Sequence, residues 1–301
     1  MLIGDGLAFA SAVFFAVAYI AIAKAARERT ADNGVLLSIV MTGALSAFAF
    51  VLRVDTTPRS GASLPAAVAW FAASGIFATV WGRLTLFKAV RLAGVIRATT
   101  IRRLTPFFSI LLAWAVLGES VSGFAASGMI LIAASFALVY ADNSRKLAAI
   151  ELFPDADLPR GYMFGAISAL MYAASYIVRK RGLQTLPDPY LGALLGSVAA
   201  LAYYLIGCLF SSKFRSDVRA FLSVPDPWQF FAAFCISAGQ ISQFMALNLT
   251  GVGRVAVINS VEIFLSSYLA AIVFKTEGWP SLLIMLATVL ATAGVIFVAA
   301  G

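Results

Sequence analysis

The sequence contains no histidine and only two cysteines among its 301 residues. Without histidine the chain lacks the usual zinc ligand, the usual proton carrier near neutral pH and the base of Ser-His-Asp and Cys-His nucleophile arrangements. Cys208 and Cys235 lie in long apolar runs without CxxC spacing, so we interpret them as buried apolar residues and not as a redox or metal-binding pair. We therefore predict no cofactor and no metal site, and we do not expect an enzyme.

Charged residues are also scarce, at 12% of the chain, where a soluble domain has roughly 25%. Together with 61% hydrophobic residues, this excludes an ordinary water-soluble domain and a disordered chain. The 22 Lys and Arg residues exceed the 14 Asp and Glu residues, but they gather at the ends of apolar segments, which is typical of charge that flanks a membrane. We expect the lipid bilayer, and no nucleic acid, as a partner.

Apolar segments of about 20 residues recur along the chain, the length needed to span a hydrocarbon core of about 30 Å. They are continuously apolar and much longer than the alternating strands of about 10 residues in membrane barrels. The sequence therefore predicts an all-α integral membrane protein with ten transmembrane helices. The predicted segments are 4–23, 34–53, 64–87, 94–117, 121–141, 161–178, 189–210, 227–249, 252–274 and 279–299.

A polar stretch, residues 142–160, separates two similar halves of the chain. Residues recur in the second half at a spacing of 155 and later of 158: Gly6 with Gly161, Ala18 with Ala173, Ile22 with Ile177, Ser109 with Ser267, Ala113 with Ala271, and Glu119 with Glu277. We expect a first five-helix repeat at 1–141, a polar linker at 142–160 and a second five-helix repeat at 161–301.

Because five is an odd number, the second repeat must enter the membrane from the opposite side, which makes the repeats inverted. Secondary transporters use inverted repeats with a site at their interface, and rocking of one repeat against the other gives alternating access. The alternative is a duplicated membrane scaffold that transports nothing. Since the sequence has no GxxxxGK phosphate loop, transport would be passive or driven by a gradient of an ion or a substrate.

Particular residues also resemble a known family. Pro106 lies in the middle of the fourth predicted helix, which ends on Leu117-Gly118-Glu119. With ten helices in two halves, the chain resembles the EamA-type branch of the drug/metabolite transporter (DMT) superfamily. The second half departs from the pattern, with Phe264 at the place of Pro106 and Lys275-Thr276-Glu277 at the place of Leu-Gly-Glu. The resemblance implies a multi-pass transporter of small metabolites, often directed outward, with a central cavity lined by helices of both halves.

The fourth predicted helix contains charged residues at membrane depth, where ionisable groups are costly and point to function. Thr99, Arg102 and Pro106 share one face at helical spacing. Arg102 and its neighbour Arg103 are expected to line the substrate cavity, or alternatively to anchor the helix at the interface. Pro106 removes a backbone hydrogen bond in mid-helix, which frees a carbonyl group for a ligand or only produces a packing kink.

The ninth predicted helix contains Asn259, Glu262 and Ser266 on one face, at spacings of three and seven residues. Glu262 is the deepest acid of the sequence. It is expected to bind a substrate ammonium group or to exchange H+ as a coupling group, or alternatively to form a structural Arg–Glu pair.

Four other kinds of side chain are candidates for contact with substrate, each with a structural alternative. Gln240 and Gln243 in the eighth segment could bind a polar substrate or bond to a neighbouring helix. Arg83, beside Trp81, lies near the end of the third segment and could equally be an interface residue. Tyr19, Trp81, Tyr172 and Tyr176 could give the cavity aromatic walls, although aromatic residues are also common in packing.

We expect a secondary transporter, an exporter or exchanger, of a small polar metabolite, most simply an amino acid or another carboxylate. The arginines suit an anionic group, and Glu262 suits the ammonium group of a zwitterion. A lipid or lipid-phosphate flippase is the first alternative, because the same arginines could hold a phosphate, and an integral-membrane enzyme is the second. The expected location is the cell membrane, which is the inner membrane in a Gram-negative cell.

Two arguments about orientation disagree. Fifteen of the 22 Lys and Arg residues follow the odd-numbered segments when Arg97, Arg102 and Arg103, near the start of the fourth segment, are counted with the loop before it, and six follow the even-numbered ones. Without those three arginines the count is twelve against six. In both counts the positive-inside rule places both termini outside. The family resemblance implies that both termini lie in the cytoplasm. The sequence therefore fixes neither the orientation nor the direction of transport.

Overall fold

The computed structural model describes residues 3–28, 34–52, 63–93, 98, 101–120, 122–147, 158–221, 226–273, 279 and 281–300. All regular secondary structure in these residues is helical, without a strand among them, as the sequence predicts. Eight helices are long and apolar enough to cross a membrane, and two further apolar segments, Thr105–Leu117 and Leu282–Val298, are shorter. This is the composition of a multi-pass membrane protein, while the total of ten spanning helices stays a prediction.

Most predicted segments correspond to single helices with similar bounds, because the length of an apolar run is set by the membrane it crosses. These helices are α1 (Ile3–Glu28), α2 (Gly34–Leu52), α7 (Gly123–Leu147), α8 (Leu158–Thr185), α9 (Pro189–Phe210), α11 (Pro227–Leu249) and α14 (Leu282–Ala300). A short helix, α10 (Ser212–Phe221), follows α9 and was not predicted.

Three predicted segments are interrupted in the structure. The third consists of α3 (Leu64–Gly75), a π-helical stretch, η1 (Ile76–Gly82), and α4 (Arg83–Ala93). The fourth contains α6 (Thr105–Leu112) and a second π-helical stretch, η2 (Ala113–Leu117), and the ninth contains α12 (Val252–Asn259) and α13 (Glu262–Ile272). Such π-helical stretches occur frequently at functional sites.

The structure interrupts the fourth predicted segment around Pro106. Residues 101 and 102 are helical, Arg103 and Leu104 form a turn, and Pro106 lies in the first turn of α6. Proline has no N–H group to donate to the carbonyl oxygen of Arg102, four residues earlier, and Thr105 Oγ1 donates to that oxygen instead. A role of Pro106 in ligand binding stays a prediction.

The chain forms two compact units, and each takes segments from both halves of the sequence. Unit 1 consists of Phe77–Ile177 and Gly251–Gly301, and unit 2 of Leu2–Ile76 and Val178–Thr250, with Met1 assigned to unit 1. The division falls inside η1 and inside α8.

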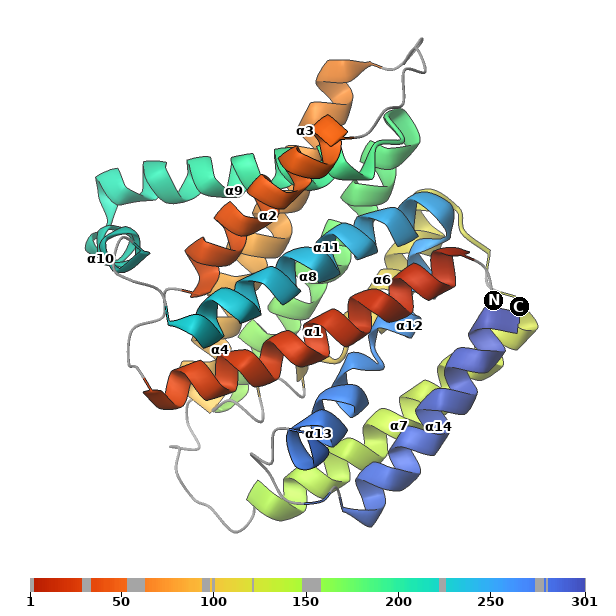
Figure 1. Cartoon of the computed structure of the whole chain (residues 1–301). Helices are drawn as coiled ribbons and strands as arrows, with labels where there is room; N and C mark the ends of the chain where they lie inside the picture. Colours follow the sequence, from red (N-terminus) through yellow and green to blue (C-terminus); the bar gives the residue numbers. More distant parts are fainter. Residues whose placement is uncertain are drawn as a thin grey trace. The chain divides into compact units, whose positions relative to one another are not determined.

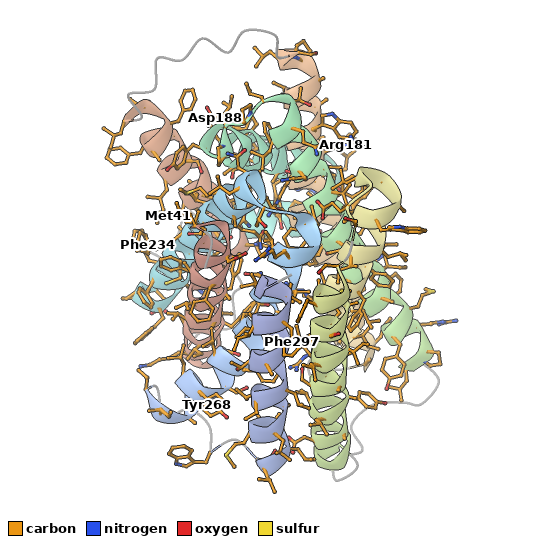
Figure 2. The ribbon with its side chains drawn as sticks, turned by 90° about the vertical axis from the view of Figure 1, so that its right-hand side faces the viewer. Met41, Arg181, Asp188, Phe234, Tyr268 and Phe297 are labelled. Atoms are coloured by element: carbon orange, nitrogen blue, oxygen red, sulfur yellow. The ribbon has the colours of Figure 1, made fainter. Side chains whose placement is uncertain are left out.

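In unit 1, α7 and α14 run side by side (Figure 1). Gly128 and Gly294 let the two backbones approach closely, because a Cβ at Gly128 would lie 2.4 Å from the carbonyl oxygen of Gly294. The same pair is seen from the side in Figure 2, with Phe297 of α14 labelled. Its ring lies 6.2 Å from that of Phe124 on α7.

The pair of α7 and α14 holds the interrupted helices of unit 1. Ile132 of α7 and Val298 of α14 form a buried cluster with Val257 of α12, and Ile110 of α6 packs against it. A second cluster joins Phe264 of α13 to residues of the same two helices. The interrupted segments therefore rest on a common apolar support.

In unit 2, the long helices pack through small residues and local polar contacts. Helices α1 and α11 run alongside each other (Figure 1), and Ser11 Oγ donates a hydrogen bond to the carbonyl oxygen of Gly239 at 2.8 Å. Phe71 of α3 and Phe244 of α11 make an edge-to-face contact, with ring centroids 6.2 Å apart. These contacts give unit 2 a core of continuous helices.

Candidate functional site

Arg102 and Arg103 lie in the turn that precedes α6. The N–H of Leu104 donates to the carbonyl oxygen of Ile101 at 3.0 Å, and Thr105 Oγ1 donates to the carbonyl oxygen of Arg102 at 2.7 Å. Because these carbonyl oxygens are satisfied locally, the chain can leave helical geometry here and resume it at Thr105. Both guanidinium groups thus belong to the turn at the N-terminal end of α6, the positive end of its dipole. This end of the helix favours an anion.

The ninth predicted segment is interrupted between Asn259 and Glu262. Helix α12 ends at Asn259, the N–H of Val261 donates to the carbonyl oxygen of Ile258 at 3.2 Å, and α13 begins at Glu262. This bond spans three residues instead of the four of an α-helix. Glu262 lies in the first turn of α13, where a carboxylate complements the helix dipole. The two predicted site residues therefore flank a helix break.

The two breaks occupy corresponding places in the two halves of the sequence. Thr105, which starts α6, and Glu262, which starts α13, are 157 residues apart, between the two repeat spacings of 155 and 158. Helices α6 and α12 are also neighbours in space. Interrupted helices at matching positions of two repeats are the arrangement in which transporters place substrate sites.

The structure brings the opposite charges of these two breaks together in unit 1. Glu262 interacts electrostatically with both Arg102 and Arg103. The guanidinium carbon of Arg102 also lies 4.4 Å from the ring centroid of Tyr172 on α8, a cation–π distance. With two cations and one anion, this cluster carries one excess positive charge.

Two buried polar atoms at the breaks have no hydrogen-bond partner within the described part of the chain: Arg103 Nη1 and Asn259 Oδ1. Asn259 Nδ2 donates to the hydroxyl oxygen of Tyr176 at 3.4 Å, which leaves Oδ1 as an acceptor. A buried polar atom without a partner costs about 1–3 kcal/mol. A ligand that offers an anionic acceptor to Arg103 and a donor to Asn259 would satisfy both atoms.

The other predicted site residues of unit 1 are Trp81, Arg83, Thr99 and Ser266. Trp81 is 47% exposed and packs edge-on against Phe77, with ring centroids 5.3 Å apart. Arg83 at the start of α4 and Ser266 on α13 are half-buried. Thr99 lies outside the described residues. Their roles therefore stay predictions.

Gln240, Gln243 and Tyr19 belong to unit 2. Gln243 is buried, and its side-chain oxygen accepts a hydrogen bond from Arg179 Nη1. Gln240 is half-buried and Tyr19 is 37% exposed. The structure gives Gln243 a protein partner, in line with the structural alternative of a bond between helices.

Sequence reasoning missed Arg179, because the sixth predicted segment ends at residue 178 and α8 continues to Thr185. Its guanidinium carbon lies 4.7 Å from the ring centroid of Phe244. A signal was present in the sequence, since the first proline after Arg179 is Pro187.

Comparisons with known proteins agree with this architecture. The family model described as the EamA-like transporter family matches residues 2–141 and 159–300. A solved structure described as "Crystal structure of protein" is similar, with a TM-score of 0.75 at 17% sequence identity over 98% of this chain and 94% of that chain. At this identity the likeness shows the fold alone. No curated protein matches the chain.

Proposed function

The chain belongs to the EamA-like transporter family, and from this premise we propose that it is a secondary transporter of a small polar metabolite bound by the Arg102, Arg103, Asn259 and Glu262 cluster. The family is one of membrane transporters within the drug/metabolite transporter superfamily. The proposal adds the substrate class, an amino acid or another carboxylate, and the residues that bind it.

The proposal rests on two buried polar atoms at the two helix breaks. Arg103 Nη1 is a cationic donor and Asn259 Oδ1 is an acceptor, and neither has a hydrogen-bond partner in the described part of the chain. A carboxylate accepts from guanidinium groups in charge-assisted bonds, which are the strong ones. An ammonium group would donate to Asn259 and face Glu262. A zwitterion therefore supplies both missing partners.

The transport cycle that we propose follows from the two sequence repeats. The repeats at 1–141 and 161–301, joined by the polar linker 142–160, would cross the membrane with ten helices in inverted orientations and alternate the access of the site between its two sides. We propose the cell membrane as the location and export or exchange as the mode. Glu262 is the candidate for coupling to H+, because it is the acid at the site.

A thermal-shift screen of the purified protein tests the substrate class, since a ligand that binds only the native state raises its stability by mass action. L-Leucine is expected to raise Tm in the wild type, and the effect is expected to vanish in Arg103→Gln and Glu262→Gln. Lys88→Gln is the matched control, because it removes a unit 1 cation that lies over the ring of Phe164. Full stabilisation by L-leucine in both site variants would overturn the assignment.

The same screen separates the flippase alternative. Two guanidinium groups at a helix N-terminus could also hold a phosphate. If only lipid phosphates stabilise the protein, and if Arg102→Ala loses this stabilisation, the substrate would be a lipid with a phosphate headgroup and not a small metabolite.

A further inference from the structure

Glu119 follows a reversal of the chain at the end of η2. Gly118 has φ 68° and ψ 23°, a left-handed conformation that glycine adopts without strain. The N–H of Glu119 then donates to the carbonyl oxygen of Ala113 at 3.2 Å. The reversal turns the chain back toward the helix that it has just left, which fixes the backbone that carries the Glu119 side chain.

The carboxylate of Glu119 binds the first turn of α12. Its Oε1 accepts a hydrogen bond from the N–H of Val252 at 3.0 Å, and its Oε2 accepts one from the N–H of Gly253 at 3.3 Å. These N–H groups have no partner inside the helix, and a negative charge at this end complements the helix dipole. A residue more than 130 positions away in the sequence therefore caps α12.

Gly251 makes room for this carboxylate. Gly251 is the residue before α12 and provides no side-chain cap of its own, in a position where Ser, Thr, Asp or Asn usually serves. A Cβ at Gly251 would lie 2.9 Å from Glu119 Oε2. Helix α12 is thus capped by the distant Glu119 and not by its own preceding residue, and Gly251 leaves the space that the carboxylate occupies.

We infer that Glu119 is a positioning residue for the substrate site. Helix α12 is only eight residues long, with Glu119 at its first turn and Asn259 at its last residue, and Glu262 follows three residues later. Loss of the cap would fray the first turn of a two-turn helix and change the placement of Asn259 and the following break. This inference rests on the proposed function only for the identity of the ligand. The effect of the cap on α12 can be measured in the protein without a ligand.

Hydrogen exchange in the detergent-solubilised protein tests the positioning role directly. Glu119→Ala is expected to speed exchange at the amides of 252–255 and also at those of 258–264, across the break. Glu119→Gln keeps one acceptor oxygen, and its exchange rates are expected to lie between those of Glu119→Ala and the wild type. Ser120→Ala, on the next and exposed residue, is the matched control and should leave exchange unchanged. Faster exchange confined to 252–255 would overturn the inference.

Uptake of radiolabelled L-leucine into proteoliposomes adds the functional readout. Glu119→Ala is expected to raise KM about tenfold with little change in Vmax, as when an interaction common to ground and transition states is lost. An unchanged KM would overturn the positioning role. Absence of L-leucine uptake in the wild type would instead contradict the proposed substrate class, and the exchange measurement would then decide the role of Glu119 alone.

A different surface, the basic face of α10, carries a second inference. Phe214, Val218 and Phe221 of α10 pack against a buried cluster of α2 and α9, and the ring of Phe214 lies 5.1 Å from that of Tyr204. The helix is therefore held against unit 2 by its apolar face. Arg215 and Arg219, one turn apart, are exposed on the flank of this apolar face.

We propose that Arg215 and Arg219 bind the headgroups of anionic phospholipids. Helix α10 begins two residues after the end of α9, a helix long and apolar enough to span the membrane. The last residues of α9, Leu209 and Phe210, are 76% and 83% exposed, as expected for side chains that contact lipid. The two arginines thus lie where the hydrocarbon gives way to headgroups, and basic residues beside a span attract anionic lipid.

Lipid-dependent thermal stability tests this surface. Phosphatidylglycerol is expected to raise the Tm of the wild type more than phosphatidylcholine does. Arg215→Gln with Arg219→Gln should weaken the apparent affinity for phosphatidylglycerol about tenfold, while Arg215→Lys with Arg219→Lys should retain most of it. Equal stabilisation of the Gln double variant and the wild type would overturn the proposal, as would equal effects of the two lipids.

Discussion

Unit 1 and unit 2 use buried arginine in different ways. In unit 2, Arg179 donates to Gln243 and lies over the ring of Phe244, within a set of long, continuous helices. In unit 1, Arg103 lies at a helix break, and its buried Nη1 has no hydrogen-bond partner in the described part of the chain. The same residue type thus bonds to a neighbouring helix in unit 2, and we propose that it binds a ligand in unit 1.

The two units also differ in the interruptions of their helices. A membrane-embedded backbone must satisfy its own hydrogen bonds, and interruptions are tolerated where they face protein or a water-filled cavity. Unit 2 contains the unbroken helices α1, α2, α9 and α11. Unit 1 contains the unbroken helices α7 and α14, and also the turn before α6 and the break between α12 and α13. The residues of the proposed site lie at these two interruptions.

The largest expected effect concerns the packing of unit 2. A Cβ at Gly75 would lie 2.0 Å from the carbonyl oxygen of Gly196, and backbone atoms cannot rotate away. Overpacking costs about 1–3 kcal/mol and occasionally more, so Gly75→Ala is expected to lower stability by about 3 kcal/mol or more, measured by thermal unfolding in detergent.

Gly43→Ala provides the control for this prediction. A Cβ at Gly43 would meet Ser197 Cβ at 3.6 Å, an ordinary contact, and the expected change is within about 0.5 kcal/mol. Equal Tm values for the two variants would contradict the description of unit 2 as tightly packed.

The next prediction compares the two arginines. Arg179→Met removes a hydrogen bond to Gln243 and a desolvated cation–π contact, with an expected loss of about 3 kcal/mol. Arg103→Met removes one of the two cations that face Glu262, and because Arg102 remains as its partner, the expected loss is smaller, about 1 kcal/mol. Thermal unfolding measures both, and a similar loss in the two variants would remove the contrast between the units.

The sequence predicted much of the fold because apolar length is a direct consequence of membrane thickness. Helices α2, α9 and α11 have bounds equal to the prediction or one residue from it. Helix α10 was missed because its ten residues are amphipathic and too short to span. The end of α8 was missed because three consecutive basic residues after 178 resemble the end of a span.

The sequence predicted the residues of the candidate site but not the helix breaks at which they lie. Arg102, Arg103, Asn259 and Glu262 were selected as ionisable or polar residues at membrane depth, and the structure places them at two helix breaks. The breaks themselves leave little trace in hydropathy, since apolar residues continue on both sides. Pro106 marked the first break. The second break has no proline.

A smaller effect is expected from the aromatic ring beside Arg102. The guanidinium group lies 4.4 Å from the ring centroid of Tyr172, a contact worth about 1–2 kcal/mol when desolvated. Tyr172→Leu is expected to weaken the apparent affinity for L-leucine about tenfold in the thermal-shift titration. Tyr172→Phe keeps the ring and should retain the affinity. If both variants lose it equally, the hydroxyl group and not the ring face is what matters.

The smallest effect concerns the C-terminal end of α11 in unit 2. Lys180 Nζ donates to the carbonyl oxygens of Leu247 and Thr250 at 2.7 and 2.9 Å, where a cation also complements the negative end of the helix dipole. Lys180→Met is expected to lower stability by about 0.5–1 kcal/mol, and Lys180→Arg should restore most of it. Because both acceptors are protein atoms, L-leucine should stabilise Lys180→Met as much as it stabilises the wild type. Loss of that stabilisation would show that unit 2 also takes part in substrate binding, and the proposal that the site belongs to unit 1 would then have to be abandoned.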